Sequence, residues 1–272
     1  MAFPVIHWRN ILRNSGALIT ASSTASGFAA TNVKDFRSFT LWKSNSVASP
    51  SYIDIDLGAS GSVDADAIGV VNHNMVAEVG QIKIYADTVF PPTNVAQASY
   101  TPTSDAVDFK TFTGPGAKRY WRVEFNKGAP FTNAPFCGVI FLGLKMTMPE
   151  YLAPDVDPFM HDIEVMTNRT AGGHAAGAIL RGIQRRGTMN FGGPAGIVRT
   201  FLASDLNAFL TGRYKRCEPW VFQLDSADSD FSPAHYLKKP DGATAPRMPV
   251  GGVYARMTVP IAYEEAYMEA AP

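Results

Sequence analysis

The polar residues around His73 are the sequence's first candidate for binding chemistry. His73 lies in VNHNM between Asn72 and Asn74, directly after a short apolar run. Imidazole and amide groups can donate and accept hydrogen bonds with a polar ligand, and loops at strand ends often carry binding sites. Asparagine is also common in tight turns because it tolerates left-handed backbone. Two interpretations therefore stay open: a ligand site at His73 and Asn74, or a structural turn.

Trp42, in the segment LWKS, is the second candidate ligand residue. An indole ring has an apolar face on which a sugar ring could stack. A large aromatic side chain is equally typical of a packed protein core. We favour the core position and keep Trp42 as a candidate sugar contact.

Motifs for catalysis and metal binding are weak. The chain contains no G-x-S-x-G, Walker A or H-E-x-x-H pattern, and its five histidines and two cysteines lack the spacing of zinc ligands. Asp54 and Asp56 stand two residues apart, as paired carboxylates for acid–base chemistry could, but we expect them to form the polar side of a strand. The sequence therefore predicts no enzyme, no cofactor and no metal site.

Composition limits the class of protein. The chain has 272 residues, of which 46% are hydrophobic and 18% charged, so we expect one large or two ordinary folded domains. Twenty-four basic residues balance 24 acidic ones, which argues against a nucleic-acid-binding protein. We expect no membrane partner, because no apolar stretch approaches the ~20 residues of a membrane helix, and no signal peptide. Cys137 and Cys217 could form one long-range disulfide, but we favour two free, buried thiols.

Residues 1–150 are predicted to form strands and turns. Alternating or continuous apolar runs, most of them bounded by turn residues, indicate strands rather than helices. The expected strands are Ser51–Leu57, Ala67–Val71, Gln81–Tyr85, Tyr120–Phe125 and Cys137–Leu144. Residues 149–158 contain three prolines and read as a linker.

Residues 151–272 are predicted to form an α+β module with one helix. Val198, Phe201, Leu202, Leu206, Phe209 and Leu210 form an apolar stripe, which predicts a helix over Pro194–Leu210 with Gly212 as its stop. The expected strands are His161–Thr167, Ile179–Phe191, Trp220–Leu224 and Val253–Tyr263, with a turn at Ala171–Gly177 and a long loop at Ser226–Pro249.

Charge is unevenly spread in this second part. Residues 169–216 hold eight basic residues against Asp205 alone, and the flanking segments are acidic. Such a distribution could orient head-to-tail association of copies, or the arginines could simply face solvent. The candidate interface residues are Arg181, Arg185, Arg186 and Arg213.

Residues 15–145 resemble the galactose-binding-like, discoidin (F5/8 type C) family. The ordered segments TASSTA at Thr20–Ala25, ATNVKDFRSFTLW at Ala30–Trp42, YIDIDLG at Tyr52–Gly58 and YWRVEF at Tyr120–Phe125 carry the resemblance. It implies a jelly-roll β-sandwich, glycan or lipid binding and, in some members, calcium. Phe36 replaces the family's glycine after the aspartate, and the last strand lacks the glutamate of the ion site, so calcium is not expected.

Residues 151–272 resemble the tube-like module of tailed-phage tail proteins, through Arg181–Phe191, Ile197–Leu210 and Pro219–Asp225. The combination of the two domains resembles a siphophage distal tail protein. That resemblance implies a hexameric ring in the virion, assembled in the host cytoplasm, that joins tail tube and hub proteins and could contact a host-surface glycan. The alternative is a carbohydrate-binding adhesin, and an enzyme with an attached binding module ranks last.

Overall fold

The computed structural model describes most of the chain and separates it into two compact units. The described residues are 3–59, 61–93, 96–149, 161–169, 175–191, 197–225, 234–246, 256–257 and 259–266. The first unit contains Met1–Thr147 together with Val221–Ala234, and the second contains Met148–Trp220 together with His235–Pro272. The chain first passes from one unit to the other after Thr147, close to the predicted boundary at residue 150. The sequence did not predict that residues 221–234 belong to the first unit.

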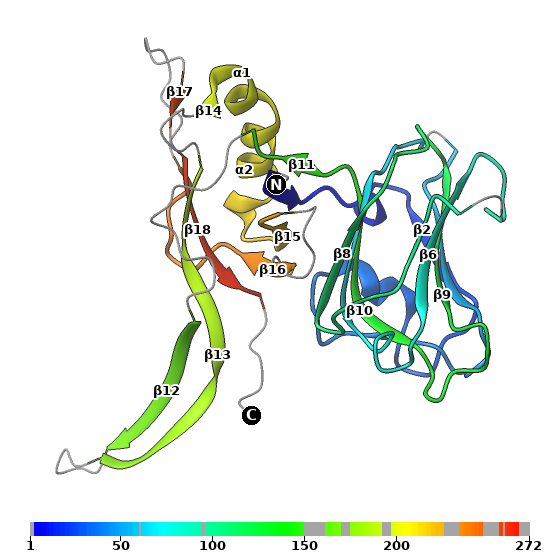
Figure 1. Cartoon of the computed structure of the whole chain (residues 1–272), viewed down its shortest axis with the longest axis horizontal. Coiled ribbons are helices and arrows are strands. Elements are labelled where there is room, and N and C mark those ends of the chain that lie inside the picture. The colour runs from blue at the N-terminus through cyan, green and yellow to red at the C-terminus, as the bar shows by residue number, and fades with distance from the viewer. Residues whose placement is uncertain are drawn as a thin grey trace. The chain divides into compact units, whose positions relative to one another are not determined.

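The first unit is an antiparallel β-sandwich (Figure 1). Apolar side chains alternate along the strands and meet between the sheets, as Ile53 and Ile55 from one sheet and Ile68 and Val70 from the other illustrate. The five-stranded sheet has the order β2 (Leu18–Ala21), β4 (Ser51–Asp56), β9 (Tyr120–Asn126), β6 (Gln81–Asp87), β7 (Ala98–Tyr100). The four-stranded sheet has the order β3 (Trp42–Lys43), β10 (Phe136–Gly143), β5 (Ala67–His73), β8 (Val107–Thr111). Short 3-10 helices occupy Ile11–Arg13 and Ala30–Lys34.

A further set of short strands belongs to the first unit. Strand β1 (Val5–His7) pairs antiparallel with β11 (Met146–Thr147) and, through Val221, Phe222 and Gln223, with β15 (Trp220–Gln223). Gly69 of the sandwich lies close to this segment, because a Cβ built at Gly69 would approach Val221 Cγ2 to 3.0 Å. A segment more than 150 residues away in sequence thus contributes to the packing of the N-terminal domain.

The second unit combines antiparallel strands with one helical run. Strand β13 (Ala175–Phe191) pairs with β12 (His161–Arg169) and, over its last six residues, with β18 (Val259–Glu265). Strand β16 (His235–Lys238) also pairs with β18, and β14 (Ile197–Val198) pairs with β17 (Arg256–Met257). The helical run comprises α1 (Arg199–Phe201), a π-helical segment (Leu202–Leu206) and α2 (Asn207–Gly212), followed by a 3-10 turn at Tyr214–Arg216.

The apolar stripe of the helix packs as its periodicity predicts. Leu206, Phe209 and Leu210 are buried, and the Phe209 ring lies edge-on to Trp220 with centroids 5.3 Å apart. The aromatic side chain of Tyr214 extends this cluster. Burial of this face, rather than local helix propensity, accounts for most of the helix's stability.

The predicted fold class is confirmed: over the described residues the protein is mainly β, with a β-sandwich and one helical run. The helix begins at Arg199 rather than at Pro194, since β14 precedes it. The long loop predicted at Ser226–Pro249 is wrong because it contains β16. The linker, apart from residue 149, lies outside the described residues, and so do residues 171–174 of the turn predicted at Ala171–Gly177. Residues 175–177 of that turn belong instead to β13, so the strand begins earlier than predicted.

Two further expectations can be compared with the structure. Cys137 and Cys217 are both free, but only Cys137 is buried, whereas Cys217 is exposed. Across the part of the chain that the structure describes, no helix is long and apolar enough to cross a membrane.

Candidate functional site

Trp42 belongs to the sandwich core. Its side chain is fully buried, and its ring stacks on Phe125 with centroids 5.6 Å apart. The indole N–H donates to the carbonyl of Ser23 at 3.1 Å, so the one polar atom of the side chain is satisfied inside the protein. The structure corrects the sugar-stacking assignment of Trp42, because neither face of the ring is open to a ligand.

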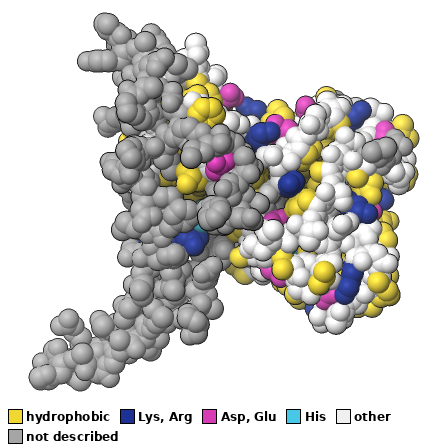
Figure 2. Space-filling model, viewed as in Figure 1, with side chains coloured by type: hydrophobic (Ala, Val, Ile, Leu, Met, Phe, Trp, Pro, Cys, Tyr) yellow, Lys and Arg dark blue, Asp and Glu magenta, His cyan; other side chains and the backbone are white. Residues whose placement is uncertain are grey.

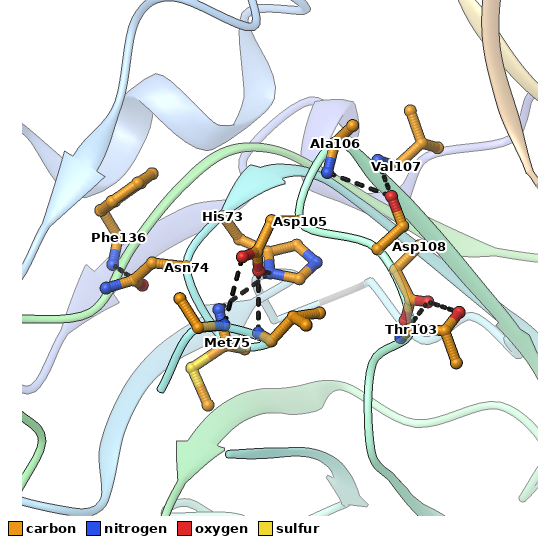
Figure 3. Close-up of polar contacts among 12 residues, drawn as sticks. His73, Asn74, Met75, Thr103, Asp105, Ala106, Val107, Asp108 and Phe136 are labelled. Atoms are coloured by element: carbon orange, nitrogen blue, oxygen red, sulfur yellow. Dashed lines mark hydrogen bonds and ion pairs between the residues drawn. The ribbon is translucent and has the colours of Figure 1, made fainter. Parts of the chain in front are cut away.

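His73 ends β5, and its ring is buried. Figure 3 shows the ring beside Asp105 and the backbone of Met75. Its Nδ1 lies 3.0 Å from Oδ1 of Asp105 and 3.1 Å from the backbone nitrogen of Met75. Nδ1 can donate to the carboxylate when it carries the proton, or accept from Met75 when it does not, but it cannot do both. The Asp105 carboxylate also accepts from the backbone N–H groups of Val76 and Ala77, at 2.8 and 3.2 Å.

These contacts explain the pKa of Asp105. Partial burial opposes ionisation, but the hydrogen bond with His73 and those from the backbone N–H groups of Val76 and Ala77 outweigh it and lower the pKa of the carboxyl group. The ionised carboxylate therefore joins the loop before β8 to the turn that follows β5. His73 therefore has a structural role: it helps to connect these two segments.

Asn74 has the same structural role. Its Oδ1 accepts from the backbone N–H of Phe136 at 3.1 Å, and its Nδ2 donates to the carbonyl of Ala134 at 3.4 Å (Figure 3). Only 8% of Asn74 and 2% of His73 are exposed, so neither offers an open hydrogen-bonding edge to a ligand. Of the two interpretations of this segment, the structural turn describes its geometry.

Glu78 makes further contacts from the turn that follows β5, and the sequence did not identify this residue as important. Its buried carboxylate accepts from the backbone N–H groups of Thr132 and Asn133, at 2.6 and 2.8 Å, and from Lys127 Nζ at 3.2 Å. Desolvation opposes ionisation, but these donors outweigh it and lower the pKa of Glu78 to about 2. The donors lie 49–55 residues away along the chain, so no local pattern could have marked this glutamate.

The outer surface of the five-stranded sheet carries a different kind of arrangement. Tyr52 of β4, Tyr85 of β6 and Tyr120 of β9 point away from the core and are partly exposed. They surround Arg122, which lies opposite both Asp54 and Tyr85 in the strand register. We call Tyr52, Tyr85, Tyr120 and Arg122, with the side chains between them, the tyrosine face.

Arg122 is fixed at the centre of the tyrosine face. Its Nε donates to Asp54 Oδ1 at 2.6 Å and its Nη2 donates to Asp54 Oδ2 at 2.9 Å, so the pair is bidentate. The guanidinium carbon also lies 3.8 Å from the centroid of the Tyr52 ring. The bidentate pair fixes the position of the guanidinium group, which in turn packs on the Tyr52 ring.

The same pattern recurs two residues further along β4. Arg119 donates to both carboxylate oxygens of Asp56, at 2.7 and 3.0 Å, and lies over the Tyr120 ring at 4.7 Å. The hydrogen bonds from Arg119 lower the pKa of Asp56. Phe90, which is 53% exposed, lies 5.6 Å from Tyr120 and extends the aromatic area.

The outward positions of Asp54 and Asp56 agree with the strand pattern, which predicted them as the polar side of β4. The aromatic part of the tyrosine face was missed. Each tyrosine occupies a recognisable outward position of its own strand, but no pattern within one strand shows which strands become neighbours.

Three of the four candidate interface arginines already pair with acidic residues of the same unit. Nη1 of Arg185 lies 3.0 Å from Oε1 of Glu265 and 2.9 Å from Nδ1 of His235. Arg186 contacts Glu264 at 3.3 Å, and Arg213 contacts Glu218 at 2.5 Å. The expected attraction between the basic segment and an acidic flank therefore occurs, for these three, within one chain. The side chain of Arg181 lies outside the described residues.

Comparisons with known proteins give structural neighbours only. No protein-family model matches the sequence, and no curated protein does. A chitosan-binding module from a Paenibacillus sp. IK-5 chitosanase/glucanase is 26% identical, covers 50% of this chain and 98% of its own, and gives a TM-score of 0.41. A CBM32 module from Clostridium perfringens is 20% identical, with 49% and 98% coverage and a TM-score of 0.39. The lectin-binding domain of lectinolysin, in complex with Lewis b, is 20% identical, with 50% and 96% coverage and a TM-score of 0.39.

Proposed function

We propose that the β-sandwich is a carbohydrate-binding module and that its ligand lies across the tyrosine face. The observation that carries this proposal is the placement of three partly exposed tyrosines around the fixed Arg122–Asp54 pair. Aromatic rings present apolar faces to the C–H side of a sugar, while phenol, guanidinium and carboxylate groups can hydrogen-bond its hydroxyls. The discoidin-like sequence pattern over residues 15–145 supports the same class of ligand.

Solvent exposure favours the tyrosine face as the ligand site over the candidates Trp42, His73 and Asn74. Trp42, His73 and Asn74 are buried, and the indole N–H of Trp42, Nδ1 of His73 and the side-chain amide of Asn74 contact other parts of the protein. On the sheet face, by contrast, Leu18, Thr20 and other outward side chains beside the tyrosines are exposed. A ligand could reach this surface without any loop opening.

The test uses the full-length protein on a glycan array, followed by calorimetric titration of the glycans that bind. We expect Tyr85→Ala to weaken binding about tenfold or more, because a stacking surface worth ~1.4 kcal/mol is lost. The matched control is Phe39→Ala, which removes a ring that is 77% exposed and belongs to the loop before β3. Unchanged affinity of a folded Tyr85→Ala variant, or an array without any bound glycan, would overturn the proposal.

A structural role in a phage tail tip is the second candidate, and one observation in the second unit favours it. Strand β13 has 17 residues, but only Arg186–Phe191 pairs with β18. Within the described residues, the remainder of β13 pairs with β12 alone. An isolated two-stranded ribbon is marginally stable, and its open edges favour pairing with another chain.

Pairing of this ribbon with further copies would generate a ring, as the tail-protein resemblance implies. The second candidate is therefore a hexameric virion component, assembled in the host cytoplasm between tail tube and hub proteins, with glycan binding as an accessory activity. It assigns no catalytic step, cofactor, nucleic acid or membrane to the chain. Light scattering and electron microscopy of the full chain test it: closed rings are expected, and a monomer at the highest attainable concentration would exclude it.

A further inference from the structure

Arg122 would ordinarily point to an acidic ligand, but its charge is already neutralised within the protein. Both of its hydrogen bonds to Asp54 are short, and the two side chains are only 10% and 7% exposed. A sulfate or carboxylate ligand would have to displace Asp54 to gain the same bidentate contact. Displacement would leave a largely buried carboxylate without its cation, which is strongly unfavourable.

The rest of the tyrosine face carries no excess of positive charge either, since Lys83 lies opposite Glu124 in the strand register. Arg119 is engaged by Asp56 in the same bidentate manner. The outward carboxylates are Asp54, Asp56, Asp87 and Glu124, and the outward cations are Lys83, Arg119 and Arg122, so this surface carries one net negative charge. Figure 2 likewise shows basic and acidic side chains interspersed over the visible side of the first unit.

The spacing of the rings indicates the size of the ligand. Tyr120 lies opposite Asp56 in the register, and Asp56 is four residues from Tyr52 along β4. Four residues of a strand span about 13 Å. A single sugar ring cannot contact both Tyr52 and Tyr120, whereas a short oligosaccharide can.

We infer that the tyrosine face selects an uncharged oligosaccharide and discriminates against acidic glycans. This inference rests on the proposed carbohydrate-binding function. Arg122 then contributes its remaining N–H groups as hydrogen-bond donors to hydroxyls and holds Tyr52, while its charge takes no part in recognition.

The test compares matched pairs of glycans, one neutral and one carrying a sulfate or sialic acid on the same core, against the full-length protein. We expect the neutral member to bind at least tenfold more tightly. We also expect its affinity to change less than about twofold between low and high salt, because screening acts only on charge–charge attraction. The salt series uses the unmodified chain and needs no variant.

Asp54→Asn releases the charge of Arg122 with almost no change of shape. We expect the ratio of its affinities for the acidic and the neutral glycan to rise about tenfold relative to the native chain. Asp87→Asn is the matched control, because it removes one negative charge from the same surface at a different position. In the native chain the Asp87 carboxylate accepts hydrogen bonds from the backbone N–H groups of Thr88 and Val89. Thermal unfolding verifies that both variants are folded.

The outcomes separate the two proposals. Tighter, salt-sensitive binding of the acidic glycan would overturn the inference and leave the carbohydrate-binding function standing. Equal binding of both members, or an Asp54→Asn variant no better than Asp87→Asn toward the acidic one, would also overturn it. Absence of binding to either class would remove the proposed function together with the inference.

Discussion

Nδ1 of His73 and Oδ1 of Asp105 lie 3.0 Å apart and join the end of β5 to the loop before β8. Glu78 binds the backbone of Thr132 and Asn133 from the other side of the same turn. Residues 75–79 form this turn, and its last residue, Val79, has a φ of +53°, in the left-handed region that β-branched residues avoid. The two carboxylate anchors hold a backbone conformation that the residue itself disfavours.

Val79→Gly should therefore stabilise the protein. The valine is 77% exposed and loses little burial, while glycine adopts positive φ without steric strain. We expect the free energy of unfolding to rise by about 1 kcal/mol in urea titrations. Val47→Gly is the control: it is also exposed but lacks positive φ, so it should lower stability, and a destabilised Val79→Gly would contradict the explanation.

His7 should make the protein sensitive to mild acid. Complete burial lowers the pKa of His7 to about 4, and the unfolded state protonates near 6.5. Because the unfolded state binds the proton more readily, stability is full above pH 6.5 and falls as the pH drops toward 4. The loss approaches ~3 kcal/mol. His7→Leu should flatten the stability curve in this window, and an unchanged slope would contradict the assignment.

Glu78 should act in a lower pH window. Its pKa of about 2 lies below the ordinary value of 4.5, so its contribution is present above pH 4.5 and is lost as the pH falls toward 2. Other carboxylates also titrate there, so the informative quantity is the difference in stability between the native chain and Glu78→Gln. That difference should shrink between pH 4.5 and 2, and a constant difference would show that the charge of Glu78 is not involved.

Gly69 and Val221 should be energetically coupled. A methyl group at position 69 would lie 3.0 Å from Val221 Cγ2, so Gly69→Ala is expected to cost about 1–3 kcal/mol by overpacking. Val221→Ala removes the clashing methyl groups. The double variant should therefore cost less than the sum of the single ones, by about 0.5 kcal/mol or more in chemical denaturation. Strict additivity would place residues 221–234 away from the sandwich in solution.

Arg185 and Arg186 are neighbours that should respond differently to removal of charge. Arg185→Met leaves Glu265, which is only 5% exposed, without its guanidinium partner, and should cost about 3 kcal/mol or more. Arg186 is 54% exposed, so Arg186→Met should cost less than about 1 kcal/mol. Calorimetry measures both. A large loss of stability or of oligomer mass for Arg186→Met alone would instead point to a role between copies.

Local sequence patterns determined the class of the fold. The alternation in Ser51–Leu57, Gln81–Tyr85 and Tyr120–Phe125 fixed which side of each strand is buried, because period two is imposed by the backbone itself. The apolar stripe ending at Leu210 likewise defined the helix, although its start moved to Arg199. The outward positions of Asp54 and Asp56 followed from the same alternation.

Tertiary structure alone decided what these elements bring together. Glu78 finds its donors 49–55 residues away, and Val221 pairs with His7 across the length of the chain. The tyrosine face depends on β4, β9 and β6 being neighbours in that order. Periodicity reports only the environment of a residue within its own strand, whereas the order of strands is set by packing between distant segments. The sequence by itself therefore determined the strands, the helix and the buried side of each strand. Long-range packing decided which polar residues connect distant segments and which surface is open to a ligand.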